Sequence, residues 1–142
     1  MKRLFLFFLI IPFASVTGFV NRHETTTSLA EVRSGEWPIT LERTIERSDT
    51  SYSLQFRDEQ VMNSIVMDTL TFQDLGQLKY FGRALTVLKT GNNGDIAKFK
   101  DYSIKRAEKK YEGVWYILRM QWSLTNFRQP EADIMISTIR GL

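Results

Sequence analysis

Apolar and polar positions alternate in the first half of the chain. Residues 37–45 and 51–57 each place apolar side chains at alternate positions, with Arg43 as the one exception. These apolar positions are Ile39, Leu41, Ile45, Tyr52, Leu54 and Phe56. A period of two is typical of β-strands with one buried face, so we expect two strands, joined as a hairpin through the polar residues 46–50. Residues 61–70 carry apolar side chains on both faces, which predicts a third strand that is either more central or interrupted by a bulge.

The period changes after residue 70. Leucine and phenylalanine recur at spacings of three and four between Leu75 and Leu88, which predicts an amphipathic helix. Thr71 is the expected N-cap and Gly91 the expected C-cap of this helix. A second helix is predicted over residues 130–141, because Pro130 suits the first helical position and an apolar stripe follows it.

Alternation returns between the two helices. Residues 99–108 and 114–123 predict a second hairpin, which turns at Tyr111-Glu112-Gly113. The predicted order is therefore β-β-β-α-β-β-α. This order predicts an α+β fold of two layers, with an antiparallel sheet of about five strands and both helices packed on one of its faces.

The N-terminus has the three parts of a secretory signal. Lys2 and Arg3 precede thirteen almost wholly apolar residues, and small residues follow as far as Gly18. The apolar stretch is too short for a membrane-spanning helix and matches a signal peptide. We expect residues 1–18 to be a cleavable signal peptide, which makes the protein periplasmic or extracellular and leaves no transmembrane helix in the mature form.

The remaining chain is expected to form one domain behind a tether. Residues 19–35 are polar and rich in threonine, which predicts a flexible tether. A short helix is possible there, because Ser28 to Glu31 has the pattern of a capping box. Residues 36–142 are then a single α+β domain.

Charge is distributed unevenly along the chain. The net charge of +3 falls to +1 when Lys2 and Arg3 leave with the signal peptide. Residues 24–74 hold ten acidic and four basic side chains, whereas residues 96–128 hold eight basic and three acidic ones. These local net charges of −6 and +5 predict two oppositely charged faces, which could partly neutralise each other in the fold.

Few catalytic chemistries are open to this chain. It has no cysteine, and its one histidine, His23, lies in the expected tether. A Ser-His-Asp or Cys-His site and the usual zinc sites are therefore unavailable, and we expect neither an enzyme nor a bound metal or cofactor. An alternative is a small hydrolase that uses only carboxylates. Its candidates are Asp68, Asp74, Asp95 and Asp101.

The second hairpin combines basic and aromatic residues between positions 98 and 122. The candidate binding residues are Lys98, Lys100, Tyr102, Lys105, Arg106, Lys109, Lys110, Tyr111 and Trp115. Such a surface suits an anionic partner, either an acidic protein or an anionic polysaccharide. Export of the protein argues against nucleic acid as that partner. We expect a non-enzymatic binding or accessory module. One alternative function is that of a structural envelope protein. The alternative interpretation of the hairpin is that its aromatic residues belong to the core while its lysines protect the sheet edge from pairing.

Overall fold

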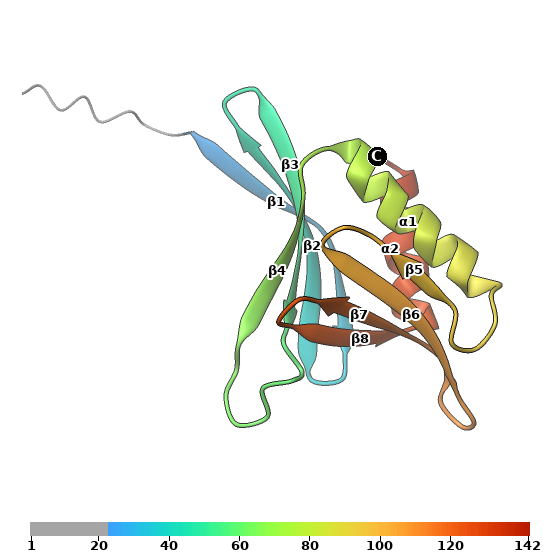
Figure 1. Cartoon of the computed structure of the whole chain (residues 1–142). Coiled ribbons are helices and arrows are strands. Elements are labelled where there is room, and N and C mark those ends of the chain that lie inside the picture. Colours follow the sequence, from blue (N-terminus) through green and yellow to red (C-terminus); the bar gives the residue numbers. More distant parts are fainter. Residues whose placement is uncertain (1–22) are drawn as a thin grey trace, which may run out of the picture.

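A computed structural model describes residues 23–142, and the expected signal peptide lies outside these residues. The chain forms eight strands and two helices (Figure 1). The elements of the first half are β1 (Glu24–Ser34), β2 (Trp37–Glu46), β3 (Asp49–Arg57), β4 (Met67–Phe72) and α1 (Leu75–Lys89). Those of the second half are β5 (Ile96–Lys98), β6 (Tyr102–Lys109), β7 (Gly113–Met120), β8 (Leu124–Arg128) and α2 (Gln129–Arg140).

The order of elements is β-β-β-β-α, repeated once. Strands β1 to β4 form a first antiparallel sheet in chain order, and β5 to β8 form a second one. The α+β class, the antiparallel strands and the packing of helices against sheet are confirmed. The single sheet of about five strands is replaced by two sheets of four, because β1, β5 and β8 add strands that local periodicity did not indicate.

Both helices pack against the inner faces of the sheets. α1 contacts β3 and β4 of the first sheet and β5 and β6 of the second, whereas α2 contacts β1, β7 and β8. The helices run antiparallel, because Gly82 of α1 lies against Ile139 near the end of α2, and Lys89 at the end of α1 reaches Asp133 near its start. The buried apolar side chains from both sheets and both helices form one core. The other face of each sheet is thus left for solvent or partners.

Two expectations for the first half are wrong. Residues 24–34 of the expected tether form strand β1, and the short helix expected at Ser28 to Glu31 does not occur. Val32 of this strand is buried in the core. Pairing with β2 and contact with α2 outweigh the local capping pattern. The predicted third strand starts late: residues 58–66 form a loop, and β4 begins only at Met67.

Helix α1 begins one turn later than the sequence predicted. Asp74, not Thr71, is its N-cap, and the Asp74 carboxylate accepts a hydrogen bond from the backbone N–H of Gln77 at 2.8 Å. The C-cap is Thr90 instead of Gly91. α2 begins at Gln129 with proline in its first turn, in agreement with the expected start.

The ion pair between the helices gives a pH-dependent contribution to stability. Lys89 donates a hydrogen bond to Asp133 at 2.8 Å, and this bond lowers the pKa of the Asp133 carboxyl group. A lowered pKa in the folded state stabilises the fold above the unfolded pKa and loses its effect as pH falls through the folded value. We expect Lys89→Met to cost about 0.5 kcal/mol at neutral pH, because the pair is half exposed. Urea unfolding should show this cost shrinking toward acid pH, and Lys79→Met should show no such trend; a cost independent of pH would contradict the assignment.

Candidate functional site

The outer face of the second sheet carries the clearest concentration of charge. Alternation along β6, β7 and β8 turns Ile104, Tyr116 and Phe127 inward to the core. Their neighbours in sequence therefore point outward, and the strand register brings them into cross-strand rows. One row joins Ile96, Lys105, Ile117 and Asn126, and the next joins Lys98, Ser103, Arg119 and Leu124.

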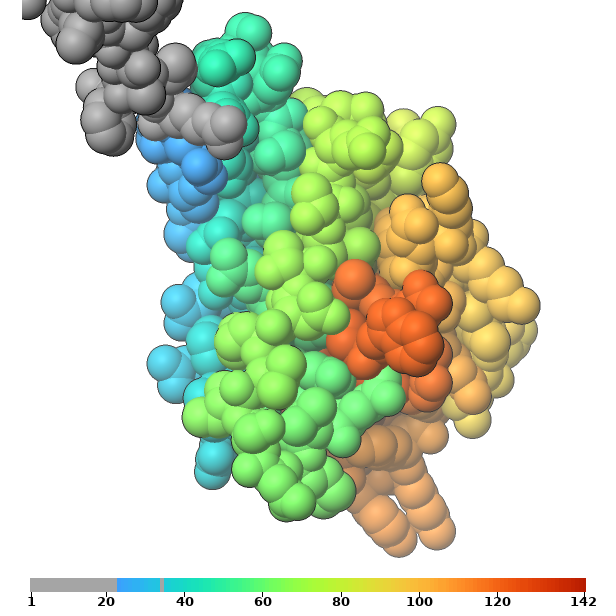
Figure 2. Space-filling view, turned by 60° about the vertical axis from the view of Figure 1, so that its left-hand side comes forward, coloured from blue at the N-terminus to red at the C-terminus, as the bar shows by residue number. Residues whose placement is uncertain are grey.

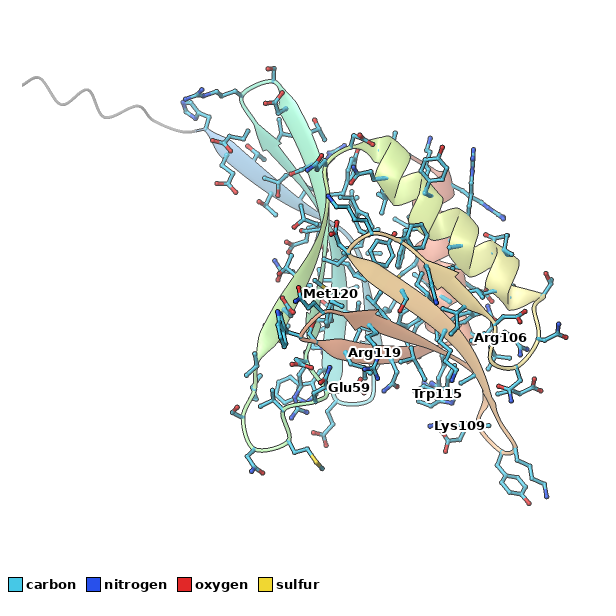
Figure 3. All side chains as sticks on the ribbon, viewed as in Figure 1. Glu59, Arg106, Lys109, Trp115, Arg119 and Met120 are labelled. Carbon is cyan, nitrogen blue, oxygen red and sulfur yellow. The ribbon has the colours of Figure 1, made fainter. Side chains whose placement is uncertain are left out.

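Five cations and no carboxylate occupy the strand positions on this outer face. We call them the basic face, and they are Lys98, Lys105, Lys109, Arg119 and Arg128. Figure 3 looks onto this side of the molecule, with Arg119, Trp115 and Lys109 labelled. Two of the cations are compensated, because Lys109 pairs with Glu112 at 3.0 Å and Arg128 with Glu131 at 2.9 Å.

The other three cations, Lys98, Lys105 and Arg119, are exposed. None of them forms an ion pair with any of the residues 23–142. They therefore present uncompensated positive charge from three neighbouring strands.

The first sheet presents the opposite charge. Its register turns Glu24, Glu31, Glu42, Glu46 and Asp49 outward, against two arginines, Arg33 and Arg57. Within the described part of the chain, no salt bridge links the two sheets. The two charged segments thus lie on the outer faces of separate sheets, where each remains available to a partner.

The structure divides the nine residues singled out in the sequence into three groups. Lys105, Lys109 and Trp115 lie on the outer face, as does Lys98. Lys110 and Tyr111 project from the turn of the β6–β7 hairpin, and Lys100 lies in the turn between β5 and β6. Arg106 and Tyr102 point inward. Arg119 and Arg128 complete the basic face but were missed, because only the strand register places them beside the lysines.

Arg106 has a structural position. It is 7% exposed, and its guanidinium group pairs with Glu108 at 3.2 Å. Its backbone lies opposite Tyr116, whose pKa is raised by burial, and the positive charge of Arg106 opposes that rise. Burial likewise raises the pKa of the Tyr102 hydroxyl. Both side chains point inward and support the sheet, and Tyr102 also lines a hollow at one end of the basic face.

A hollow of about 690 Å³ lies at one end of the basic face. Lys98 and Arg119 line it together with Lys100 and Tyr102, so four cationic or aromatic side chains of the hairpin meet there. The floor includes Phe99, whose ring stacks on Tyr102 at 4.4 Å between centroids. The exposed indole of Trp122 stands at the rim.

A groove of about 440 Å³ lies beside Trp115 and Asn126 on the outer face. Trp37 and Arg57 of the first sheet line its other wall, and the Arg57 guanidinium lies 5.0 Å from the centre of the Trp37 ring. On the Trp115 side, Lys109 lies 4.1 Å from the ring centre. Among residues 23–142, the buried Trp115 indole N–H and Arg57 Nε–H have no hydrogen-bond partner.

Most of the candidate carboxylates bond to backbone groups. Asp74 caps α1, and Asp95 accepts a hydrogen bond from the Asn92 N–H at 2.6 Å within the helix-to-strand turn. Asp68 and Asp101 both line the larger hollow, and no hydrogen bond joins them. A hydrolase based on these carboxylates therefore stays a prediction. No cluster of three potential metal ligands occurs in residues 23–142.

Comparison with known proteins adds no relative. The sequence matches no protein-family model and no curated protein. Among the described residues, no helix has the length and apolar character needed to cross a bilayer. The functional argument therefore depends on the surface chemistry of this chain itself.

Proposed function

We propose that this protein is an exported, non-enzymatic binding module that holds an anionic partner on its basic face. The observation that carries the proposal is the outer face of the second sheet, where Lys98, Lys105 and Arg119 are exposed and uncompensated and where no strand position is acidic. Export rests on the N-terminal pattern of a basic start, an apolar stretch and a small-residue end.

The arrangement suits an extended polyanion better than a small anion. The three cations come from three adjacent strands, which lie about 4.8 Å apart in a sheet, so they are spread over two neighbouring cross-strand rows and not gathered in a closed pocket. Carboxylates repeated along an acidic polypeptide or an anionic polysaccharide can contact several of them at once. The aromatic groups at both ends, Trp115 and Trp122, add apolar contact area to this electrostatic attraction.

Charge reversal on the basic face tests this proposal. We expect the triple variant Lys98→Glu, Lys105→Glu and Arg119→Glu to bind poly-L-glutamate or polygalacturonate more weakly by at least about ten-fold, which is roughly 1.4 kcal/mol. Calorimetric titration of each polymer at low salt gives the affinity. Arg106 is left unchanged, because reversal of a buried and paired charge would endanger the fold.

A matched control exists on the helical side of the molecule. Lys79, Arg83 and Arg140 line a groove between α1 and α2, and their reversal to glutamate gives the same change in net charge. This control should retain at least half of the parent affinity. Equal losses in both triple variants would show that only net charge matters, and an affinity unchanged by either would remove the basic face as the binding surface.

A further inference from the structure

Five large apolar side chains are exposed where the two sheets meet. Four come from the loop between β3 and β4 and from the first residue of β4, and the fifth comes from the turn between β7 and β8. We call them the apolar fringe, and they are Met62, Ile65, Val66, Met67 and Trp122. Met62 is 87% exposed and Trp122 is 79% exposed. Met62 lines the smaller groove and Trp122 the larger hollow, so the fringe extends along the border between the sheets, and large exposed apolar groups there mark a candidate interaction surface.

The apolar fringe borders the basic face at two places. Met62 lines the smaller groove together with Trp115 and Asn126, both of which belong to the outer face of the second sheet. Trp122 lines the larger hollow together with Lys98 and Arg119. In Figure 2 the β7–β8 turn, in orange-red, lies directly against the green surface of β4 and its preceding loop.

The loop that carries Met62 and Ile65 is anchored at both ends. The backbone N–H of Asp58 donates to Val66 O at 2.8 Å, which closes the loop on itself. The next residue, Glu59, donates its backbone N–H to Leu124 O of β8 at 2.8 Å, and its carboxylate accepts bonds from Asn126. The loop is thus fastened to the edge of β8, and its apolar side chains face away from the core.

We infer that the basic face and the apolar fringe together bind the surface of an anionic phospholipid bilayer. This inference rests on the proposed function, because it uses the same cations and names their partner. Lysine and arginine are attracted to anionic headgroups, and apolar side chains enter the boundary between headgroups and acyl chains. Neither signal alone gives firm attachment, and this surface combines both.

The shape of the apolar fringe distinguishes a bilayer from a folded protein partner. The fringe residues lie on the β3–β4 loop, at the start of β4 and on the β7–β8 turn, whereas docking of a partner helix requires an apolar groove and docking of a strand requires a free sheet edge. Methionine is flexible and tryptophan is enriched at membrane interfaces, so both suit insertion into a fluid layer. The cations Lys98 and Arg119 line the same hollow as Trp122, so headgroup phosphates could contact them while the indole enters the bilayer.

The test uses protein purified from cells that export it, with its N-terminus established by mass spectrometry. Binding is measured by co-sedimentation with vesicles of phosphatidylglycerol mixed with phosphatidylcholine, and with vesicles of phosphatidylcholine alone. We expect the mixed vesicles to bind the parent at least about ten-fold more strongly, because the cations require anionic headgroups. The variant Met62→Gln, Ile65→Gln and Trp122→Gln should bind mixed vesicles roughly 30-fold more weakly, since three apolar side chains no longer leave water.

The control replaces two exposed apolar residues on the helices. Val87→Gln and Ile134→Gln remove exposed apolar area from α1 and α2, and binding should stay within two-fold of the parent. Lipids brominated in the acyl chains should quench the parent's tryptophan emission, and the Trp122→Gln variant should lose most of that quenching. Thermal unfolding of each variant verifies that it is folded.

The outcomes separate this inference from the proposed function. If the fringe variant binds vesicles as the parent does, or if the parent binds both kinds of vesicle equally, the bilayer inference is wrong, even where poly-L-glutamate binding survives. A fringe variant that loses poly-L-glutamate to the same extent as vesicles would identify an acidic protein partner and would also overturn it. If the parent protein binds neither the anionic vesicles nor either anionic polymer, the proposed function is wrong as well.

Discussion

Replacement of Phe81 by alanine is expected to lower the free energy of unfolding by about 3–5 kcal/mol. Phe81 is fully buried on α1, and its ring lies 5.3 Å from Phe72 of β4 and 6.1 Å from Tyr102 of β6. These three rings belong to the first sheet, the helix and the second sheet. Loss of the Phe81 ring therefore removes its contacts with Phe72 and Tyr102, at the place where the two halves of the chain meet.

Chemical denaturation followed by circular dichroism measures this effect. Tyr80→Ala is the matched control, because Tyr80 precedes Phe81 on the same helix but is 61% exposed, so its loss should cost less than about 1 kcal/mol. If the halves were separately stable, Phe81→Ala would split the unfolding curve into two transitions. A single transition with a cost near that of the control would contradict the central place given to this ring.

Replacement of Asp58 by alanine is expected to cost about 3 kcal/mol. The buried Asp58 carboxylate accepts hydrogen bonds from the backbone N–H groups of Gln60 at 3.0 Å and Leu124 at 3.1 Å. Leu124 begins β8, so this carboxylate joins the end of the first sheet to the edge of the second. Alanine would leave both N–H groups without this acceptor, and because the two bonds are partly buried, their loss is costlier than that of two exposed bonds.

The conservative variant separates the hydrogen bonds from simple packing. Asparagine keeps one side-chain oxygen in place, so Asp58→Asn should recover more than half of the stability that alanine loses. Exchange of the Leu124 amide proton should become faster in Asp58→Ala, whereas Asp49→Ala, at an exposed hairpin position, should leave it unchanged. Equal stability of the alanine and asparagine variants would show that the bonds contribute nothing.

Asp58 also connects stability to the inferred membrane surface. Its backbone N–H closes the loop that carries Met62 and Ile65, and its side chain holds the start of that loop against β8. The loop can therefore present apolar side chains to solvent because backbone bonds and carboxylates, not apolar burial, keep it in place.

Sequence patterns predicted the elements in which the buried apolar side chains recur with a regular period. The alternation of Leu54 and Phe56 and the helical spacing of Leu78, Leu85 and Leu88 each mark one buried face, and β3 and α1 occur where these patterns predicted them. Elements without such a mark were missed. β5 has three residues, too few for a period, and β1 is polar over most of its length because only its final part reaches the core.

The sequence predicted which residue types make up the candidate site but not how the sheet arranges them. The lysines of the second hairpin and Trp115 lie on paired strands, since a hairpin keeps nearby residues together, and their role in binding stays a prediction. Arg106 and Lys105 are adjacent in sequence and yet lie on opposite faces, so one is core and the other surface. Val61 to Val66 looked like a strand because their apolar character was attributed to burial, whereas the structure exposes most of them.

By itself, the sequence determined the α+β class, the main hairpins, both helices and the uneven distribution of charge, because each of these depends on residues close together in the chain. Only the tertiary structure decided that there are two sheets, that five cations share one outer face, and that an apolar fringe borders it. Which side of a strand meets solvent depends on what packs against the other side. That information lies in strand register and in contacts between distant segments, such as Asp58 with Leu124, which no local pattern contains.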